Sequence, residues 1–292
     1  MRPSRPLLVL AALVAALLAS VPALGATAAP PGLVRSGTTS DGWVRYALAD
    51  GALPGPALPG VELRAEVHFP LAGRDRAVRL LVPASAPRPA PLLLALHGLY
   101  QTVAVADRDQ GWGAQARRSG FVLAYGVGTS ASWDAGTCCG DAVEQGVDDV
   151  AYLDRVVEVA RALHPLDPRR LDVTGFSNGA MMAYRYACER PAAVAAVLAV
   201  SGTVVADCPG RVDVAVLAVH GLDDRTVPLA GRAYDPALHS PLPPVSHTTA
   251  FFGPRISAVL LPRFGHGWPD AVHGRYATTA RGWAFLQAHP QP

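Results

Sequence analysis

The pentapeptide Gly175-Phe176-Ser177-Asn178-Gly179 places a serine between two glycines, where one hydrophobic pattern gives way to another. Residues 170–174 before it predict a short buried strand, and residues 180–187 after it are typical of a helix. At a sharp strand-to-helix turn, side chains at the two glycine positions would collide with the neighbouring strand and helix. Ser177 is therefore a candidate nucleophile, whose chemistry requires a base, an orienting acid and oxyanion donors.

Continuous apolar runs elsewhere predict the strands of a parallel sheet that is covered on both faces. These runs are residues 91–96, 121–125, 194–200, 214–219 and 256–261. Helical patterns separate most of them, among them 148–163, which Asp148 or Asp149 can cap, and 276–288. Two alternating segments, 62–69 and 76–82, predict an antiparallel hairpin at a sheet edge. The sequence therefore predicts an α/β fold with a mostly parallel central sheet and helices on both faces.

Length and composition favour one catalytic domain over two. The 292 residues contain no repeat or long polar linker, so we expect a single domain over 60–292, preceded by an extended lead-in over 29–59. Half of the residues are hydrophobic and the formal net charge is only +2, so nucleic acid is not an expected partner. The chemistry of a serine nucleophile requires neither a metal nor another cofactor.

Residues 1–28 have the layout of a secretory signal peptide. Arg2 and Arg5 precede an apolar run over 7–19, and small residues follow over 23–28. The run is short for a membrane span, which favours cleavage over an uncleaved anchor. We therefore expect an extracellular protein with no stable membrane span after cleavage.

The four cysteines, Cys138, Cys139, Cys188 and Cys208, form an even set in a chain that we expect to be exported. Such a set predicts two disulfides rather than a metal site or a thiol nucleophile. Adjacent cysteines rarely bridge each other, because the intervening peptide bond holds their side chains apart. We therefore expect Cys138 and Cys139 each to pair with one of the other two, and both connectivities stay open.

Polar residues follow the predicted strands at the ends where a sheet of this type binds ligands. His97, Ser177 and His266 each come after a different strand, and Asp223 and Asp224 come after a fourth. His266 is the candidate general base, because an imidazole can both accept and return the proton of the serine. One of the two aspartates would orient the imidazole, and physical reasoning does not choose between them.

Backbone N–H groups must stabilise the oxyanion that forms when a serine attacks a carbonyl group. We expect one donor from Asn178, directly after the nucleophile, and the second from Leu99, in the loop after His97-Gly98. His97 and His220 are expected to organise their loops beside glycines.

Three aromatic residues, Tyr100, Trp133 and Trp268, flank the predicted catalytic loops. They are candidates for lining an apolar or aromatic-acid pocket, and ordinary packing beneath the loops explains each of them equally well.

The order Ser, Asp, His along the chain is that of α/β-hydrolases. The motifs resemble the secreted esterase family that includes polyhydroxybutyrate depolymerases, feruloyl esterases and acetylxylan-type esterases, over about residues 76–269. The resemblance rests on His97-Gly98, the stretches 133–140 and 147–150, Gly175 to Met181 with Cys188 after it, the stretch 220–228, and Gly265 to Pro269. It implies an α/β-hydrolase fold. In the family the acid is the fifth residue of the loop that begins at His220, which selects Asp224.

The segment 228–265 is shorter than is usual in this family and carries no cysteine, so we expect a more open pocket. The resemblance implies a serine carboxylic-ester hydrolase that acts through an acyl-enzyme on short-chain, hydroxyalkanoate or hydroxycinnamate-type esters, free or linked to a polymer. Two alternatives stay open, namely a peptidase of the same fold and a non-catalytic cell-envelope binding protein on a hydrolase scaffold.

Overall fold

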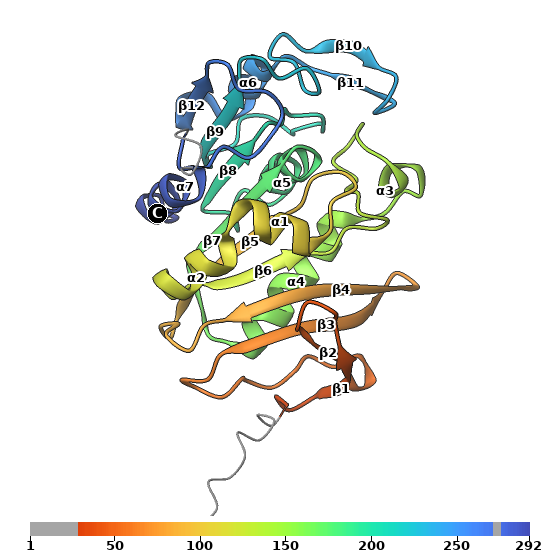
Figure 1. Cartoon of the computed structure of the whole chain (residues 1–292), viewed down its shortest axis with the longest axis vertical. Helices are drawn as coiled ribbons and strands as arrows, with labels where there is room; N and C mark the ends of the chain where they lie inside the picture. The colour runs from red at the N-terminus through yellow and green to blue at the C-terminus, as the bar shows by residue number, and fades with distance from the viewer. Residues whose placement is uncertain (1–28, 271–275) are drawn as a thin grey trace, which may run out of the picture.

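The computed structural model describes residues 29–270 and 276–292 (Figure 1). The predicted signal peptide, residues 1–28, lies outside the described residues. A ten-stranded sheet runs through the molecule in the order β1-β2-β3-β4-β6-β5-β7-β8-β9-β12, with helices on both faces, and β10 and β11 form a separate hairpin. The predicted α/β fold with a mostly parallel sheet is confirmed.

The elements have the following bounds. The strands of the large sheet are β1 (Leu33–Thr38), β2 (Val44–Leu48), β3 (Leu63–Leu71), β4 (Arg74–Val82), β5 (Ala90–Leu96), β6 (Val122–Gly126), β7 (Leu166–Phe176), β8 (Ala196–Val200), β9 (Ala215–Gly221) and β12 (Ile256–Leu261). The hairpin consists of β10 (Arg232–Asp235) and β11 (Ser240–Leu242). The helices are α1 (Val103–Gln110), α2 (Trp112–Ser119), α3 (Asp141–Glu144), α4 (Asp149–Leu163), α5 (Asn178–Glu189), α6 (Thr248–Phe252) and α7 (Thr278–Ala288).

The side chains of β5 explain why this strand is continuously apolar. Leu92 and Leu94 face the core that contains the apolar side chains of α4 and α5. Leu93 and Ala95 face the opposite core, which contains residues of α1, α2 and α7. Successive side chains of a strand point to opposite faces, so both sets of side chains are buried when helices cover both faces of the sheet.

Six neighbouring strands, β6, β5, β7, β8, β9 and β12, are all parallel to one another. Their carboxyl ends therefore meet at one edge of the sheet, which is where the predicted site residues emerge. This arrangement positions loops that are far apart in the sequence beside one another.

The segment predicted as an extended lead-in forms β1 and β2, which join the large sheet. β2 pairs in parallel with β3, and β3 and β4 form the predicted antiparallel hairpin. The prediction that this hairpin lies at the sheet edge was therefore wrong, because β1 and β2 cover its outer side. Tyr46 and Leu48 of β2 are buried in the main core, which supplies the apolar contact that holds the added strands.

Asp172 is an acidic residue in the interior of β7. Its side chain is almost fully buried, and in the described part of the chain its Oδ1 has no hydrogen-bond partner. Burial raises the pKa of Asp172 well above its ordinary value, although the charge of Arg170 and the backbone of Ala196 oppose that shift. A carboxyl group in this state is more easily tolerated in the protonated form.

We predict that Asp172→Asn stabilises the protein at neutral pH. A carboxyl group whose pKa is raised by folding binds more protons in the folded state than in the unfolded state. The free energy of unfolding therefore falls as the pH rises above the unfolded value of about 4 towards the folded value. Urea unfolding between pH 4 and pH 8 measures the effect. The free energy of unfolding of the variant should exceed that of the parent by about 1–3 kcal/mol at pH 7, and by less at pH 4.

Asp213→Asn provides the matched control, because the Asp213 side chain is 80% exposed. This control should leave the pH dependence of the free energy of unfolding unchanged. Parallel pH profiles for Asp172→Asn and the parent would contradict the prediction.

Candidate active site

Ser177 occupies the turn between β7 and α5, and its backbone has a φ of 54°. Few non-glycine residues adopt this left-handed region, and strain of this kind is typical of nucleophile turns. A Cβ atom on Gly175 would meet the backbone of Gly179, and one on Gly179 would meet the backbone of Leu96 and His97. The two glycines therefore let the strand, the helix and the neighbouring β5 approach closely enough to expose the serine at the edge of the sheet.

A continuous chain of hydrogen bonds joins three of the predicted site residues. Ser177 Oγ lies 2.9 Å from His266 Nε2, and His266 Nδ1 lies 2.8 Å from Asp224 Oδ2. In the tautomer that this chain requires, Nδ1–H donates to the carboxylate and Nε2 accepts from the hydroxyl. The arrangement has the geometry needed to transfer a proton from a serine hydroxyl to an imidazole whose orientation a carboxylate fixes.

Asp224 is buried and has both oxygens engaged. Oδ1 accepts hydrogen bonds from the N–H groups of Thr226 and Val227, which leaves Oδ2 for His266. Burial alone would raise the pKa of Asp224. The hydrogen bond and the charge of His266, together with the hydrogen bond from the Val227 N–H, lower this pKa below its ordinary value. The carboxylate therefore stays ionised beside the imidazole, whereas the exposed Asp223 contributes only its backbone N–H to a hydrogen bond with Phe264.

His220 stabilises the loop that carries Asp224. Its Nε2–H donates to the carbonyl of Val227 at 2.8 Å, and the same nitrogen lies 3.4 Å from Asp224 Oδ2. Burial lowers the pKa of His220, against the opposing effects of Val227 and Asp224. His220 is therefore held as a neutral residue that organises its loop, as predicted for a histidine beside a glycine.

His97 has an equivalent part in the loop after β5. Its Nδ1–H donates to the carbonyl of Gly98, and its Nε2 accepts from the N–H of Gly128, at 2.8 and 3.1 Å. Burial lowers the pKa of His97 to about 4, although the Gly98 carbonyl opposes that shift. The neutral ring thus joins two loops at the sheet edge and fixes the backbone that leads to Leu99.

The N–H groups of Leu99 and Asn178 are the predicted oxyanion donors. Neither group donates a hydrogen bond to another part of the described chain. Asn178 is the first residue of α5, where backbone N–H groups have no partner within the helix. Leu99 and Ser177 line the same cleft, so both N–H groups belong to segments that border the serine.

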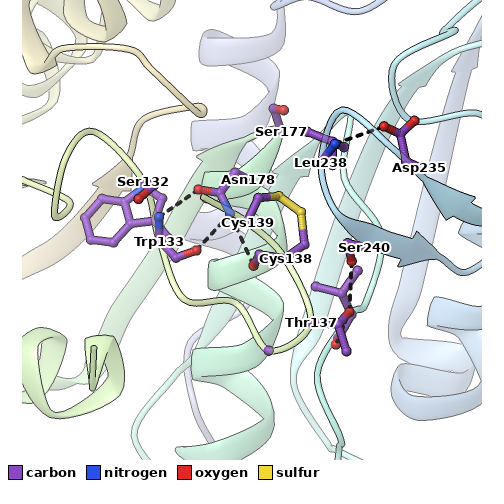
Figure 2. The surroundings of a disulfide bond; sticks show 12 residues. Ser132, Trp133, Thr137, Cys138, Cys139, Ser177, Asn178, Asp235, Leu238 and Ser240 are labelled. Atoms are coloured by element: carbon purple, nitrogen blue, oxygen red, sulfur yellow. Dashed lines mark hydrogen bonds between the residues drawn. A yellow bond between two sulfur atoms is a disulfide. The ribbon is translucent and has the colours of Figure 1, made fainter. Parts of the chain in front are cut away.

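The side chain of Asn178 fixes the loop after β6, as Figure 2 shows. Asn178 Oδ1 accepts from the N–H of Trp133 at 2.8 Å, and Nδ2 donates to the Trp133 carbonyl at 3.0 Å. Asp149 Oδ2 accepts from the N–H of Asp134, and Arg185 donates to both the carbonyl and the carboxylate of Asp134. The residue that follows Ser177 is therefore locked to a loop that α4 and α5 also anchor.

The disulfides join Cys138 to Cys139 and Cys188 to Cys208, so the predicted cross-pairing was wrong. A cis peptide bond links Cys138 to Cys139 and brings their Cα atoms to 3.1 Å from each other. The prediction assumed a trans peptide bond, which holds the two side chains apart. The Cys138–Cys139 pair lies beside Asn178 (Figure 2), whereas Cys188–Cys208 ties the end of α5 to the segment after β8.

A cleft of about 740 Å³ opens at Ser177 and His266. Its remaining lining residues are Leu99, Tyr100, Gln101, Arg108, Asp109, Gln110, Phe176, Thr226, Ala237, Leu238, Gly267, Trp268 and Asp270. Two of the predicted pocket residues, Tyr100 and Trp268, are among these. Trp133 is not: its side chain is fully buried, and its indole N–H donates to the carbonyl of His97. Of the two interpretations left open for Trp133, packing beneath the loop fits the structure and lining the pocket does not.

The segment 228–265 was expected to leave the pocket more open. It forms the β10–β11 hairpin, whose tip residues Ala237 and Leu238 line the cleft, followed by the short helix α6 and the strand β12. The sequence analysis also missed Arg108 and Gln110 of α1. The turn-forming pair Asp235-Pro236 was the one signal in the sequence that could have indicated the hairpin.

Residues 29–270 and 276–292 contain no group of three metal-ligating side chains that could hold an ion. In the same residues, no helix is long and apolar enough to cross a membrane.

Residues 145–249 match the model of a phospholipase/carboxylesterase family. Feruloyl esterase C of Emericella nidulans is 30% identical over 165 residues, which are 54% of this chain and 58% of that protein. Poly(3-hydroxyalkanoate) depolymerase C of Paucimonas lemoignei is 32% identical over 126 residues, 41% of this chain and 30% of the relative. The chain therefore spans only part of the length of the curated relatives that it matches.

Among solved structures, an acetyl xylan esterase from Aspergillus awamori matches with a TM-score of 0.53 at 15% identity, over 72% of this chain and 93% of that one. This likeness concerns the fold alone. The topology and the solved structure show that the chain has the α/β-hydrolase fold. The sequence matches show that it is a distant homologue of feruloyl esterase C, of poly(3-hydroxyalkanoate) depolymerase C and of a bifunctional acetylxylan esterase/xylanase of Neocallimastix patriciarum, with residues 145–249 matching the phospholipase/carboxylesterase family.

Proposed function

We propose that this chain is an exported serine carboxylesterase in which Ser177 is the nucleophile, His266 the general base and Asp224 the acid that orients it. The observation that carries the proposal is the unbroken hydrogen-bond chain from Ser177 through His266 to Asp224 at the mouth of a cleft. Each residue type matches its task, and each comes from a different loop at the carboxyl edge of the sheet.

In the proposed reaction, Ser177 Oγ attacks the ester carbonyl carbon while its proton moves to His266 Nε2. The carbon–oxygen bond to the alcohol then breaks, and His266 returns the proton to the leaving oxygen, which leaves an acyl-enzyme on Ser177. Water enters, gives a proton to His266 and attacks the acyl carbon. Collapse of this second intermediate releases the acid and restores the Ser177 hydroxyl, so no cofactor takes part.

The negative charge on the former carbonyl oxygen requires donors that are already in place. We assign this task to the backbone N–H groups of Leu99 and Asn178, because both lack a partner in the described chain and both segments border Ser177. Donors that need no rearrangement at the moment of reaction make a large contribution to catalysis of this kind. His97 and the Asn178 side chain are positioning groups that hold these two segments.

The relatives' names support an ester substrate of the short-chain, hydroxyalkanoate or hydroxycinnamate type, free or linked to a polymer. Tyr100 and Trp268 give the cleft aromatic surface beside the serine, and Tyr100 is 73% exposed. The two disulfides support an extracellular location, since such bonds persist in oxidising compartments. A peptidase or a non-catalytic binding protein on the same scaffold would give different results in the following experiments.

The Ser177→Ala variant tests the nucleophile. We predict that a fluorophosphonate probe labels the parent at neutral pH and not this variant, and that kcat/KM for nitrophenyl acetate falls by more than about 10³-fold. Peptide substrates should not be cleaved by the parent.

Ser201→Ala is the matched control, because Ser201 also follows a parallel strand and has a φ of 53°, but its hydroxyl donates to the carbonyl of Gly267 and not to a histidine. This variant should keep its labelling. A parent protein that is neither labelled nor active on esters would favour the binding role.

The Asn178→Ala variant tests the positioning of the oxyanion donor. Loss of the two hydrogen bonds to Trp133 frees the loop beside the Asn178 N–H, so we expect kcat to fall about 10- to 100-fold while KM changes little. Steady-state kinetics on nitrophenyl acetate measure this split between kcat and KM.

Arg185→Gln is its control, since Arg185 anchors the same loop at Asp134, farther along α5 from Ser177. Arg185→Gln should lower the free energy of unfolding and leave kcat close to the value of the parent. Equal losses of kcat in both variants would mean that general loosening of the loop, and not Asn178, is responsible.

A further inference from the structure

We propose that Leu238, at the tip of the β10–β11 hairpin, sets the size of the acyl group that the cleft accepts. This inference rests on the proposed esterase function and assigns a specificity-determining residue to the same site. It concerns the segment 228–265, whose β10–β11 hairpin places Ala237 and Leu238 in the lining of the cleft.

Two walls of the cleft differ in chemistry. The hairpin wall presents the apolar side chains of Ala237 and Leu238. The wall formed by α1 presents the charged side chains of Arg108 and Asp109, which pair with each other at 2.9 Å. A substrate with one apolar part and one polar part is therefore matched to this cleft in one orientation about Ser177.

The hairpin tip is held in place by a buried carboxylate. Asp235 is 4% exposed, and its Oδ1 accepts hydrogen bonds from the N–H groups of Ala237 and Leu238, at 2.9 and 3.0 Å. The other oxygen pairs with Arg232, which belongs to the same strand. In the view of Figure 2, Leu238 lies between Asp235 and Ser177. Asp235 thus fixes the backbone of the two residues that line the cleft.

The hairpin is also tied to the loop that Asn178 holds. Thr137 Oγ1 lies within hydrogen-bond distance of Ser240 Oγ, at 3.1 Å, and Thr137 precedes the Cys138–Cys139 disulfide (Figure 2). Leu242 is fully buried, and Leu238 packs against the main core. The wall is therefore already formed in the free protein, and the size of the side chain at position 238 determines how far the wall projects into the cleft.

The apolar wall fits the acyl part of the ester. In short-chain and hydroxycinnamate esters of a polar alcohol, the acyl group carries the hydrocarbon, and its carbon chain extends from the carbonyl carbon that Ser177 attacks. A sugar or other polar alcohol is better matched to the α1 wall, which offers the charged groups of Arg108 and Asp109. Leu238 is therefore expected to act on the acyl chain and not on the alcohol.

The test measures kcat/KM for nitrophenyl acetate, butyrate, hexanoate and octanoate with the parent, Leu238→Ala and Leu238→Phe. A cavity opened by the smaller side chain should raise the ratio of hexanoate to acetate about ten-fold, and phenylalanine should lower it. Tyr234→Ala is the matched control, since Tyr234 is 56% exposed on the same hairpin and does not line the cleft. It should leave the ratio unchanged. Thermal unfolding checks that all variants are folded.

A second series, acetates of alcohols of increasing length, tests the assignment to the acyl group. The proposal predicts no change in selectivity across this series for either Leu238 variant. Ratios that stay at the parent value in the acyl series, or that shift in the alcohol series instead, would overturn the inference while leaving the esterase function intact. A parent that hydrolyses none of these esters would refute the proposed function itself.

Discussion

The close approach of backbone segments around the turn from β7 to α5 is the constraint on which the rest of the site depends. Gly175 and Gly179 allow contacts that any Cβ atom would prevent, and the turn holds Ser177 at a positive φ. Because this turn sits at the carboxyl edge of six parallel strands, the loops that carry Asp224 and His266 emerge beside it. The strained backbone is maintained by a core that packs both faces of the sheet.

The loops around Ser177 form a single connected structure. Neutral histidines at the ends of β5 and β9 fix two of the loops. The Asn178 side chain fixes a third loop through the backbone N–H and carbonyl of Trp133. The same third loop reaches the β10–β11 hairpin through Thr137 and Ser240. The nucleophile turn is thereby connected to the wall of the cleft through side-chain hydrogen bonds on both sides of this loop. These contacts hold the hairpin tip in the lining of the cleft that contains Ser177, where we propose that it selects the acyl group.

The central strands and the site residues could be predicted because their signals are local or follow from strand order. The apolar run of β5 indicates a strand that is buried on both faces. The glycines around Ser177 indicate a turn at which backbone segments approach closely. Other features depend on contacts that no local pattern reveals. The strands β1 and β2 join the sheet through pairing with β3 and through the burial of Tyr46 and Leu48 in the main core. The Cys138–Cys139 bridge spans a cis peptide bond, and the buried Trp133 donates its indole N–H to the carbonyl of His97 in the loop after β5.

A covalent acyl-enzyme on Ser177 is the most direct test of the account. The parent protein would be mixed with nitrophenyl butyrate, quenched in acid within milliseconds to seconds, digested and analysed by mass spectrometry. The account predicts a butyryl group on the peptide that contains Ser177, formed in step with a burst of nitrophenol and lost as butyrate appears. Turnover of the ester with no acyl group on that peptide, or with the group on another residue, would contradict it.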